Sequence, residues 1–185
     1  MEIDDLINEY KKYFPVDIII TGGEPTIYPL ELTELCKRIK DVDKNIFITL
    51  ETNGTSANDF LDYIDLASIS PKLSSSVPYN TEFENTHEKN RIIIDVLKEY
   101  HFKNLKKLFD IQWKFVVSDE KDLEEIKTIQ NEIGFENKNV FLMPEGLSSS
   151  ELINKRPALI EVCKEFRYNY SDRLHILVWG NKRGV

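Results

Sequence analysis

Residues 16–29 read VDIIITGGEPTIYP, and this stretch decides the fold. Three consecutive isoleucines are typical of a strand that is buried on both faces, as in a parallel sheet. Two glycines, an acid and a proline follow at once, and a helical pattern resumes at residue 30. Glycine allows close approach of a ligand or a positive φ, whereas Pro25 fixes its own φ. The stretch predicts a strand-to-helix turn, which is either a plain tight turn or the edge of a ligand site.

The rest of the chain alternates in the same way. Apolar runs predict further strands at residues 46–50, 66–70, 111–117, 139–143 and 173–179. Amphipathic spacing predicts helices at residues 2–13, 30–40, 58–63, 88–100, 119–133 and 149–167, with a long polar loop at 73–87. Strands alternating with helices imply an α/β fold with a mostly parallel sheet. Because no repeat or hinge divides the pattern, we predict one domain over residues 1–185.

The composition excludes several classes of protein. The 185 residues are 41% hydrophobic and 30% charged, which is ordinary for a globular domain, and the net charge is −8. A negative field argues against binding to nucleic acid or to an anionic membrane surface. No stretch approaches the roughly 20 apolar residues that span a bilayer, and the acidic start MEIDDLINEY is unlike a signal peptide. We therefore expect a cytosolic protein.

Polar or glycine-rich residues follow nearly every predicted strand. They include TGGEP at 21–25, ETNGT at 51–55, SPK at 70–72 and PEG at 144–146. The carboxyl ends of parallel strands lie on one side of the sheet, and ligands bind there. A single such turn is ordinary, but several in one sheet favour a ligand-binding rim.

Five side chains of this rim are candidates for ligand contacts. Glu24 is an acceptor for a ligand ammonium or hydroxyl, or else a solvated acid in a tight turn. Glu51 and Asn53 either bind ligand or cap the following segment. Lys72 is a cation for a ligand carboxylate, or else a surface lysine. His175 is a pocket histidine, or else a histidine on the face of the sheet.

The two cysteines do not form a metal site. Cys36 and Cys163 each lie in a helical pattern, without a second cysteine or a histidine at ligand spacing. We interpret both as small buried hydrophobic residues, and we expect neither a disulfide nor a metal.

Six segments together resemble a known family. They are ITGGEPTIYP, ETNGT, SPKLSSS, KFVVSDEKDLEEI, VFLMPEG and RLHILVWGNKRGV. Their order and spacing resemble those of 7-carboxy-7-deazaguanine synthase, a radical-SAM enzyme, from about residue 5 to the C-terminus. The resemblance implies a partial (reduced) β/α barrel. It also implies ring contraction of 6-carboxy-5,6,7,8-tetrahydropterin for queuosine and deazapurine biosynthesis, with S-adenosylmethionine, a 4Fe–4S cluster and Mg²⁺ as cofactors.

The resemblance also implies roles for individual residues. The residues assigned to S-adenosylmethionine are Gly22, Gly23, Glu24, Glu51, Asn53, Ser70, Pro71, Lys72, Met143, Pro144, Glu145 and Gly146. Those assigned to the pterin substrate are Thr21, His175 and the carboxylate of Val185. A zwitterionic methionine moiety needs an acceptor for its ammonium and a cation for its carboxylate, which Glu24 and Lys72 supply.

One departure from the family pattern is large. The family binds its cluster through a CxxxCxxC-type loop, whose three thiolates hold three irons, and this sequence has no such loop. The ligands of the cluster and of Mg²⁺ are therefore expected to be absent, together with the first strand of the barrel.

Three explanations of this departure compete. The chain is a truncated fragment, one half of a split enzyme completed by a partner chain, or a cluster-less binding or regulatory module for S-adenosylmethionine or a pterin. The first two are favoured because Glu24, Lys72, His175 and the GNKRGV tail are all present. We predict that the chain alone is inactive. Its unpaired strand edge is expected to pair with a partner chain or with a second copy.

Overall fold

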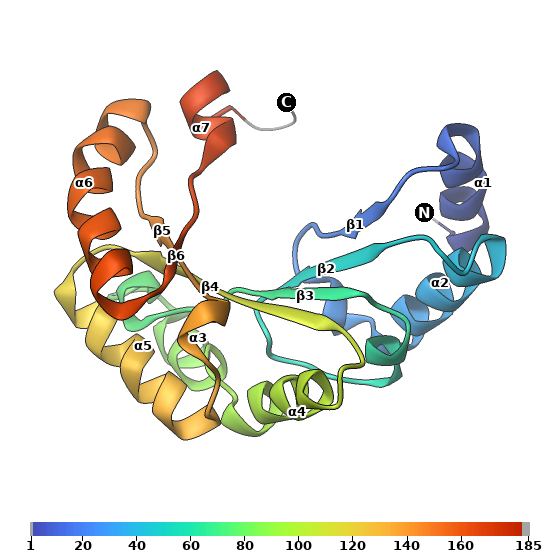
Figure 1. Cartoon of the computed structure of the whole chain (residues 1–185), viewed down its shortest axis with the longest axis horizontal. Coiled ribbons are helices and arrows are strands. Elements are labelled where there is room, and N and C mark those ends of the chain that lie inside the picture. The colour runs from blue at the N-terminus through green and yellow to red at the C-terminus, as the bar shows by residue number, and fades with distance from the viewer. Residues whose placement is uncertain (1, 183–185) are drawn as a thin grey trace. The chain divides into compact units, whose positions relative to one another are not determined.

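The computed structural model describes residues 2–182, which form two compact units (Figure 1). The first unit is Met1–Ile69 with Ile93–Gln112, and the second is Ser70–Ile92 with Trp113–Val185. The six strands follow the order β1-β2-β3-β4-β5-β6, and the pairs β1–β2, β2–β3, β4–β5 and β5–β6 are parallel. The predicted α/β fold with a parallel sheet is confirmed.

The first unit contains β1 to β3 and the helices that pack on them. Its elements are α1 (Ile3–Tyr13), β1 (Ile18–Ile20), a 3₁₀ turn (Pro25–Ile27), α2 (Pro29–Val42), β2 (Ile48–Thr52), a 3₁₀ turn (Asp59–Asp62), β3 (Leu66–Ile69) and α4 (Ile94–Leu105). Pro29 begins α2, where its fixed φ suits the first helical position. Cys36, Leu50 and Phe60 are fully buried in the core of this unit.

The second unit is built around β4 to β6. Its elements are a 3₁₀ turn (Ser74–Ser76), α3 (Glu84–Asn90), β4 (Asp110–Val117), α5 (Glu120–Ile133), a 3₁₀ turn (Asn137–Asn139), β5 (Val140–Pro144), α6 (Ser149–Phe166), β6 (Asn169–Tyr170) and α7 (Leu174–Trp179). Only the part of β4 that begins at Trp113 belongs to this unit. A capping box of Asp119 and Asp122 starts α5, and Gly134 ends it with φ 92°. Trp113 stacks on Phe135 in the core, with 4.5 Å between ring centroids.

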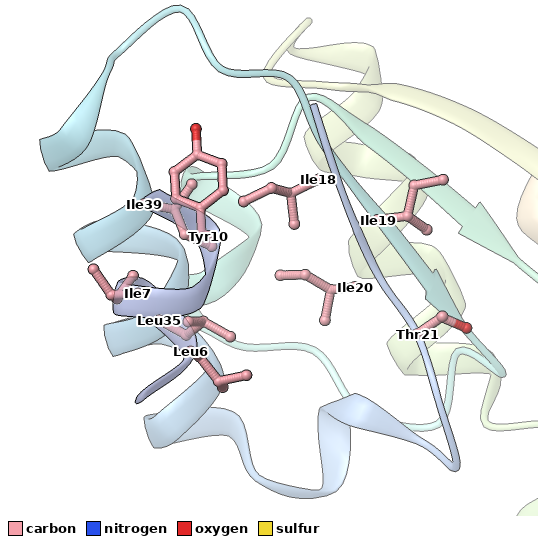
Figure 2. A pocket seen from close by; sticks show the side chains of 9 residues that line it. All are labelled: Leu6, Ile7, Tyr10, Ile18, Ile19, Ile20, Thr21, Leu35 and Ile39. Carbon is pink, nitrogen blue, oxygen red and sulfur yellow. The ribbon is translucent and has the colours of Figure 1, made fainter. Parts of the chain in front are cut away.

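Three sequence-based predictions of local structure were wrong. Residues 173–179 form helix α7 rather than a strand, and the short β6 already occupies the place beside β5. The loop predicted at 73–87 contains a 3₁₀ turn, and α3 begins inside it at Glu84. The first strand was expected to be buried on both faces, yet Ile19 is 65% exposed. This is because Ile19 points to the face of β1 opposite to the one that α1 and α2 cover (Figure 2).

Within the part of the chain that the structure describes, no helix has both the length and the apolar character needed to cross a membrane.

Candidate functional site

The carboxylate of Glu24 joins the turn that follows β1 to the turn that follows β2. Its Oε1 accepts hydrogen bonds from Thr26 N (3.1 Å), Thr26 Oγ1 (2.7 Å) and Thr52 Oγ1 (2.7 Å). Its Oε2 accepts one from Asn53 N at 2.7 Å. Thr26 and Thr52, both buried, were not identified from the sequence as partners of this acid. The one local signal was the position of Thr26, two residues after Glu24, where its amide can donate to the Glu24 side chain as the N-cap.

The turn after β2 is stabilised by further side-chain hydrogen bonds. Thr52 Oγ1 accepts from Gly54 N at 3.0 Å, and Asn53 Oδ1 accepts from Thr55 N at 2.9 Å and from Thr55 Oγ1 at 2.6 Å. Gly54 has φ 78° and is buried. The side chain of Asn53 therefore caps its own turn, one of the two roles expected for it.

Two polar side chains meet at the ends of β1 and β2. Thr21 Oγ1 donates to Glu51 Oε2 at 3.2 Å.

A buried tyrosine lies near Glu24. Tyr100 is fully buried in the same unit, and its hydroxyl donates to Ser56 O at 2.9 Å. Burial raises the pKa of Tyr100, and the negative charge of Glu24 acts in the same direction. The carboxylate of Glu24 is therefore close to the hydroxyl of Tyr100, which stays protonated.

The two glycines before Glu24 leave the backbone open. A Cβ placed on Gly22 or Gly23 would meet no atom within 4 Å, and both residues are exposed. Gly22 also has φ 128°, a conformation that other residues rarely adopt. The peptide groups beside Glu24 can therefore be approached by a ligand.

An apolar groove lies between β1 and the helices α1 and α2 of the same unit (Figure 2). Its volume is about 380 Å³. Ile18 and Ile20 point toward the helices, and Ile19 points to the opposite face of the strand. The residues that line the groove are Leu6, Ile7, Tyr10, Ile18, Ile19, Ile20, Thr21, Leu35 and Ile39. This surface is suited to apolar packing and carries none of the acidic candidates.

The second unit holds the remaining candidates for S-adenosylmethionine. Ser70, Pro71 and Lys72 follow β3, and the Pro71 side chain is buried while that of Lys72 is exposed. The carbonyl of Lys72 accepts a hydrogen bond from Arg91 Nη1 at 3.1 Å. Arg91 had not been identified from the sequence.

The candidates around the end of β5 are tied to neighbouring helices. Met143 and Pro144 are the last residues of β5, and Glu145 forms an ion pair with Lys155 at 2.8 Å. Gly146 O accepts from Arg173 Nη1 at 2.9 Å. A Cβ on Gly146 would lie 2.9 Å from Cδ2 of the buried Leu152, so a side chain here would make that leucine shift.

One residue assigned to the pterin is placed differently from expectation, and another is not described. His175 is exposed on α7 rather than on a strand, because residues 174–179 are helical. Val185 lies outside the described residues.

The residues present do not fit a 4Fe–4S cluster. Both cysteines are free and buried, Cys36 in α2 and Cys163 in α6, which confirms their interpretation as core residues. Burial raises the pKa of Cys36 to about 12 and that of Cys163 to about 11, whereas a cluster needs thiolates. Within residues 2–182, no group of three or more His, Cys, Asp or Glu side chains is arranged to hold a metal ion.

Comparison with solved structures shows a shared fold. The crystal structure of Streptococcus suis SuiB superposes with a TM-score of 0.59 at 13% identity, over 97% of this chain and 45% of that one. The structure of anSMEcpe with bound AdoMet gives 0.54 at 14% identity, over 98% of this chain and 58% of that one. The chain thus spans about half the length of these proteins, and the likeness is one of fold.

Comparison of sequences is more specific. A scan against models of protein families gives no match. The 7-carboxy-7-deazaguanine synthase of Halobacterium salinarum is 34% identical over 98% of this chain and 72% of its own length. The synthase of Rhodopirellula baltica is 31% identical over 99% of this chain and 69% of its own length. The synthase of Bacillus subtilis is 28% identical over 91% of this chain and 68% of its own length. The chain belongs to the 7-carboxy-7-deazaguanine synthase family.

Proposed function

We propose that this chain supplies the S-adenosylmethionine- and pterin-binding part of a 7-carboxy-7-deazaguanine synthase. The enzyme would contract the ring of 6-carboxy-5,6,7,8-tetrahydropterin in the cytosol, for queuosine or another deazapurine. One observation carries the proposal: Glu24 joins the turns after β1 and β2 beside the open backbone of Gly22 and Gly23. Membership of the family supplies the reaction. The free thiols suit a cytosolic protein.

The hydrogen bonds of Glu24 single out one atom for the ligand. Each carboxylate oxygen offers about two lone pairs. Oε1 already has three donors, whereas Oε2 has one, from Asn53 N. Oε2 is therefore the oxygen that would accept a hydrogen bond from the methionine ammonium, and the exposed peptides of Gly22 and Gly23 would contact the ligand as well.

The other assigned residues would complete the two ligands. The ammonium of Lys72 would pair with the methionine carboxylate, beside Ser70 and Pro71, and Met143 to Gly146 would contribute backbone contacts. Thr21 already donates its hydroxyl proton to Glu51, so its oxygen would accept from a pterin N–H. His175 and Val185 would serve the substrate.

Calorimetric titration with S-adenosylmethionine tests the proposal. The chain should bind the ligand saturably, and Gly23→Ala should weaken binding by about tenfold or more because a methyl group fills the open backbone edge. Gly23 has no positive φ, so the variant should unfold at the same urea concentration as the wild type. A wild-type chain that shows no binding would sink the proposal.

The chain alone is expected to be inactive. Anaerobic reconstitution with iron and sulfide should give no 4Fe–4S absorbance, because the sequence has two cysteines and both are buried, protonated thiols. Addition of a second polypeptide that carries a CxxxCxxC-type segment is expected to restore ring contraction. A stoichiometric cluster spectrum from this chain alone would contradict the assignment.

The edge of β1 is the surface that we propose for a partner strand, from a separate chain or a second copy. β1 stands at the end of the strand order, and an edge strand presents unpaired backbone groups. Ile19 is 65% exposed on this strand, and it points to the face opposite to α1 and α2 (Figure 2).

Sedimentation of an Ile19→Lys variant checks this surface. The wild type should associate, and lysine should shift it toward monomer because a charge on an edge strand opposes pairing. Leu30→Lys is the matched control, since Leu30 is 76% exposed on α2 and away from the edge. A wild type that sediments as a monomer and pairs with nothing would rule the surface out.

A further inference from the structure

The segment that carries Lys72 is held at both ends by buried side chains. Pro71 and Leu73 flank Lys72, and Leu73 is 2% exposed while Lys72 is exposed. Val77 is also buried, at the far end of the 3₁₀ turn Ser74–Ser76. The segment therefore has a buried apolar side, and the side chain of Lys72 is exposed.

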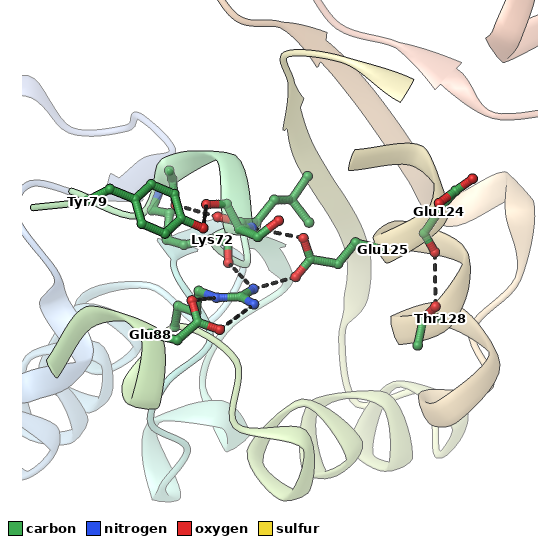
Figure 3. A network of polar contacts seen from close by, with 10 residues as sticks. Lys72, Tyr79, Glu88, Glu124, Glu125 and Thr128 are labelled. Atoms are coloured by element: carbon green, nitrogen blue, oxygen red, sulfur yellow. Dashed lines mark hydrogen bonds and ion pairs between the residues drawn. The ribbon is translucent and has the colours of Figure 1, made fainter. Parts of the chain in front are cut away.

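The backbone that follows the side chain of Lys72 is bound by two charged side chains. Arg91 Nη1 donates to the carbonyl of Lys72 at 3.1 Å and also to Glu125 Oε1. Glu125 Oε2 in turn accepts from Ser74 N at 2.8 Å. Arg91 ends α3 and Glu125 lies in α5, so two helices of this unit reach the same short segment (Figure 3).

A second carboxylate orients the guanidinium. Arg91 Nε and Nη2 donate to Glu88 Oε2 and Oε1 at 2.8 and 2.9 Å, in a bidentate pair. The side chains of Arg91 and Glu125 are 12% and 19% exposed. Because both side chains are largely buried, removal of one leaves the charge of the other poorly solvated. The loss of this ion pair should therefore destabilise the segment more than the loss of a surface ion pair would.

From this network, we infer that Arg91 and Glu125 are positioning residues for ligand recognition by Lys72. By holding Lys72 O and Ser74 N, they fix the direction in which the Lys72 ammonium meets the methionine carboxylate of S-adenosylmethionine. The inference rests on the proposed function. Neither residue touches the ligand itself.

Comparison of two ligands can show whether Arg91 and Glu125 position Lys72 for the carboxylate or only stabilise the fold. S-Adenosylmethionine carries the methionine carboxylate, and 5′-methylthioadenosine lacks it. Arg91→Lys keeps the charge but loses the planar fork, so it should weaken binding of S-adenosylmethionine about tenfold and leave that of methylthioadenosine unchanged. Lys72→Ala should do the same, and the double variant should be no weaker than either single one, because both remove one contact. Equal losses for both ligands, or additive losses, would overturn the inference.

Hydrogen exchange provides a readout that does not depend on the ligand. In the ligand-free chain, Glu125→Ala and Arg91→Lys should speed exchange of the Ser74 amide about tenfold or more, because its acceptor is lost or released. Glu161→Ala is the control, since Glu161 pairs with Lys164 on the exposed side of α6. Unchanged exchange at Ser74 would overturn the inference that Arg91 and Glu125 hold this segment. A wild type that binds neither ligand would sink the proposed function, and exchange alone would then decide whether Arg91 and Glu125 hold the segment.

Discussion

Replacing Gly54 with alanine is expected to lower the free energy of unfolding by about 3 kcal/mol or more. Two costs add at this position. Gly54 has φ 78°, where a Cβ is strained, and that Cβ would lie 2.6 Å from Leu97 Cδ2 and 2.7 Å from Ile69 Cγ2. Leu97 and Ile69 are both buried in the core of the first unit, so neither can move aside cheaply. Urea unfolding followed by circular dichroism measures the change.

Gly22→Ala is the matched control for Gly54→Ala. Gly22 also has a positive φ, 128°, but a Cβ there would meet nothing within 4 Å. This variant should therefore show the backbone cost alone, about 1 kcal/mol. Equal losses in the two variants would mean that the contacts with Leu97 and Ile69 contribute nothing.

The strands could be predicted where the sequence pattern has a single interpretation. The β-branched run at Ile18–Ile20 and the strict alternation of Asp110–Val117 both match the observed strands. Residues 173–179 were ambiguous, because a short apolar run satisfies either periodicity. In the structure these residues form a short helix that buries Ile176. The two residues of β6 pair with β5 in place of the predicted strand.

The candidate site was predictable at the level of its turns but not of its contacts. Glycine, acid and proline after a strand already indicated a rim. The bonds from Thr52 and Asn53 to Glu24 span 28 and 29 residues, and the pair of Arg91 with Glu125 spans 34. Contacts between residues that are this far apart in the chain form only in the folded protein, so they produce no local pattern in a single sequence. This is why Arg91 and Glu125 were missed.

Glu24→Ala is expected to lower the free energy of unfolding by about 3 kcal/mol and to abolish measurable binding of S-adenosylmethionine. The carboxylate accepts four hydrogen bonds, and its loss leaves the buried hydroxyls of Thr26 and Thr52 and the amide of Asn53 without an acceptor. Hydrogen bonds to a charged group stabilise by about 1.5–3 kcal/mol each, and water will replace some of them at this half-buried site. Urea unfolding and calorimetric titration measure the two effects.

Glu24→Gln separates the two roles of this side chain. The amide oxygen can replace Oε1 and keep the three threonine contacts, but the NH₂ group would face the Asn53 amide, donor against donor. The variant should therefore lose about half as much stability as Glu24→Ala, yet lose ligand binding equally, because Oε2 is the oxygen proposed for the ammonium. Glu34→Ala, on the exposed face of α2, should change neither property. If Glu24→Gln bound S-adenosylmethionine as well as the wild type, the acid would be a structural tie between two turns, and the ammonium would have to be bound by the backbone of Gly22 and Gly23 instead.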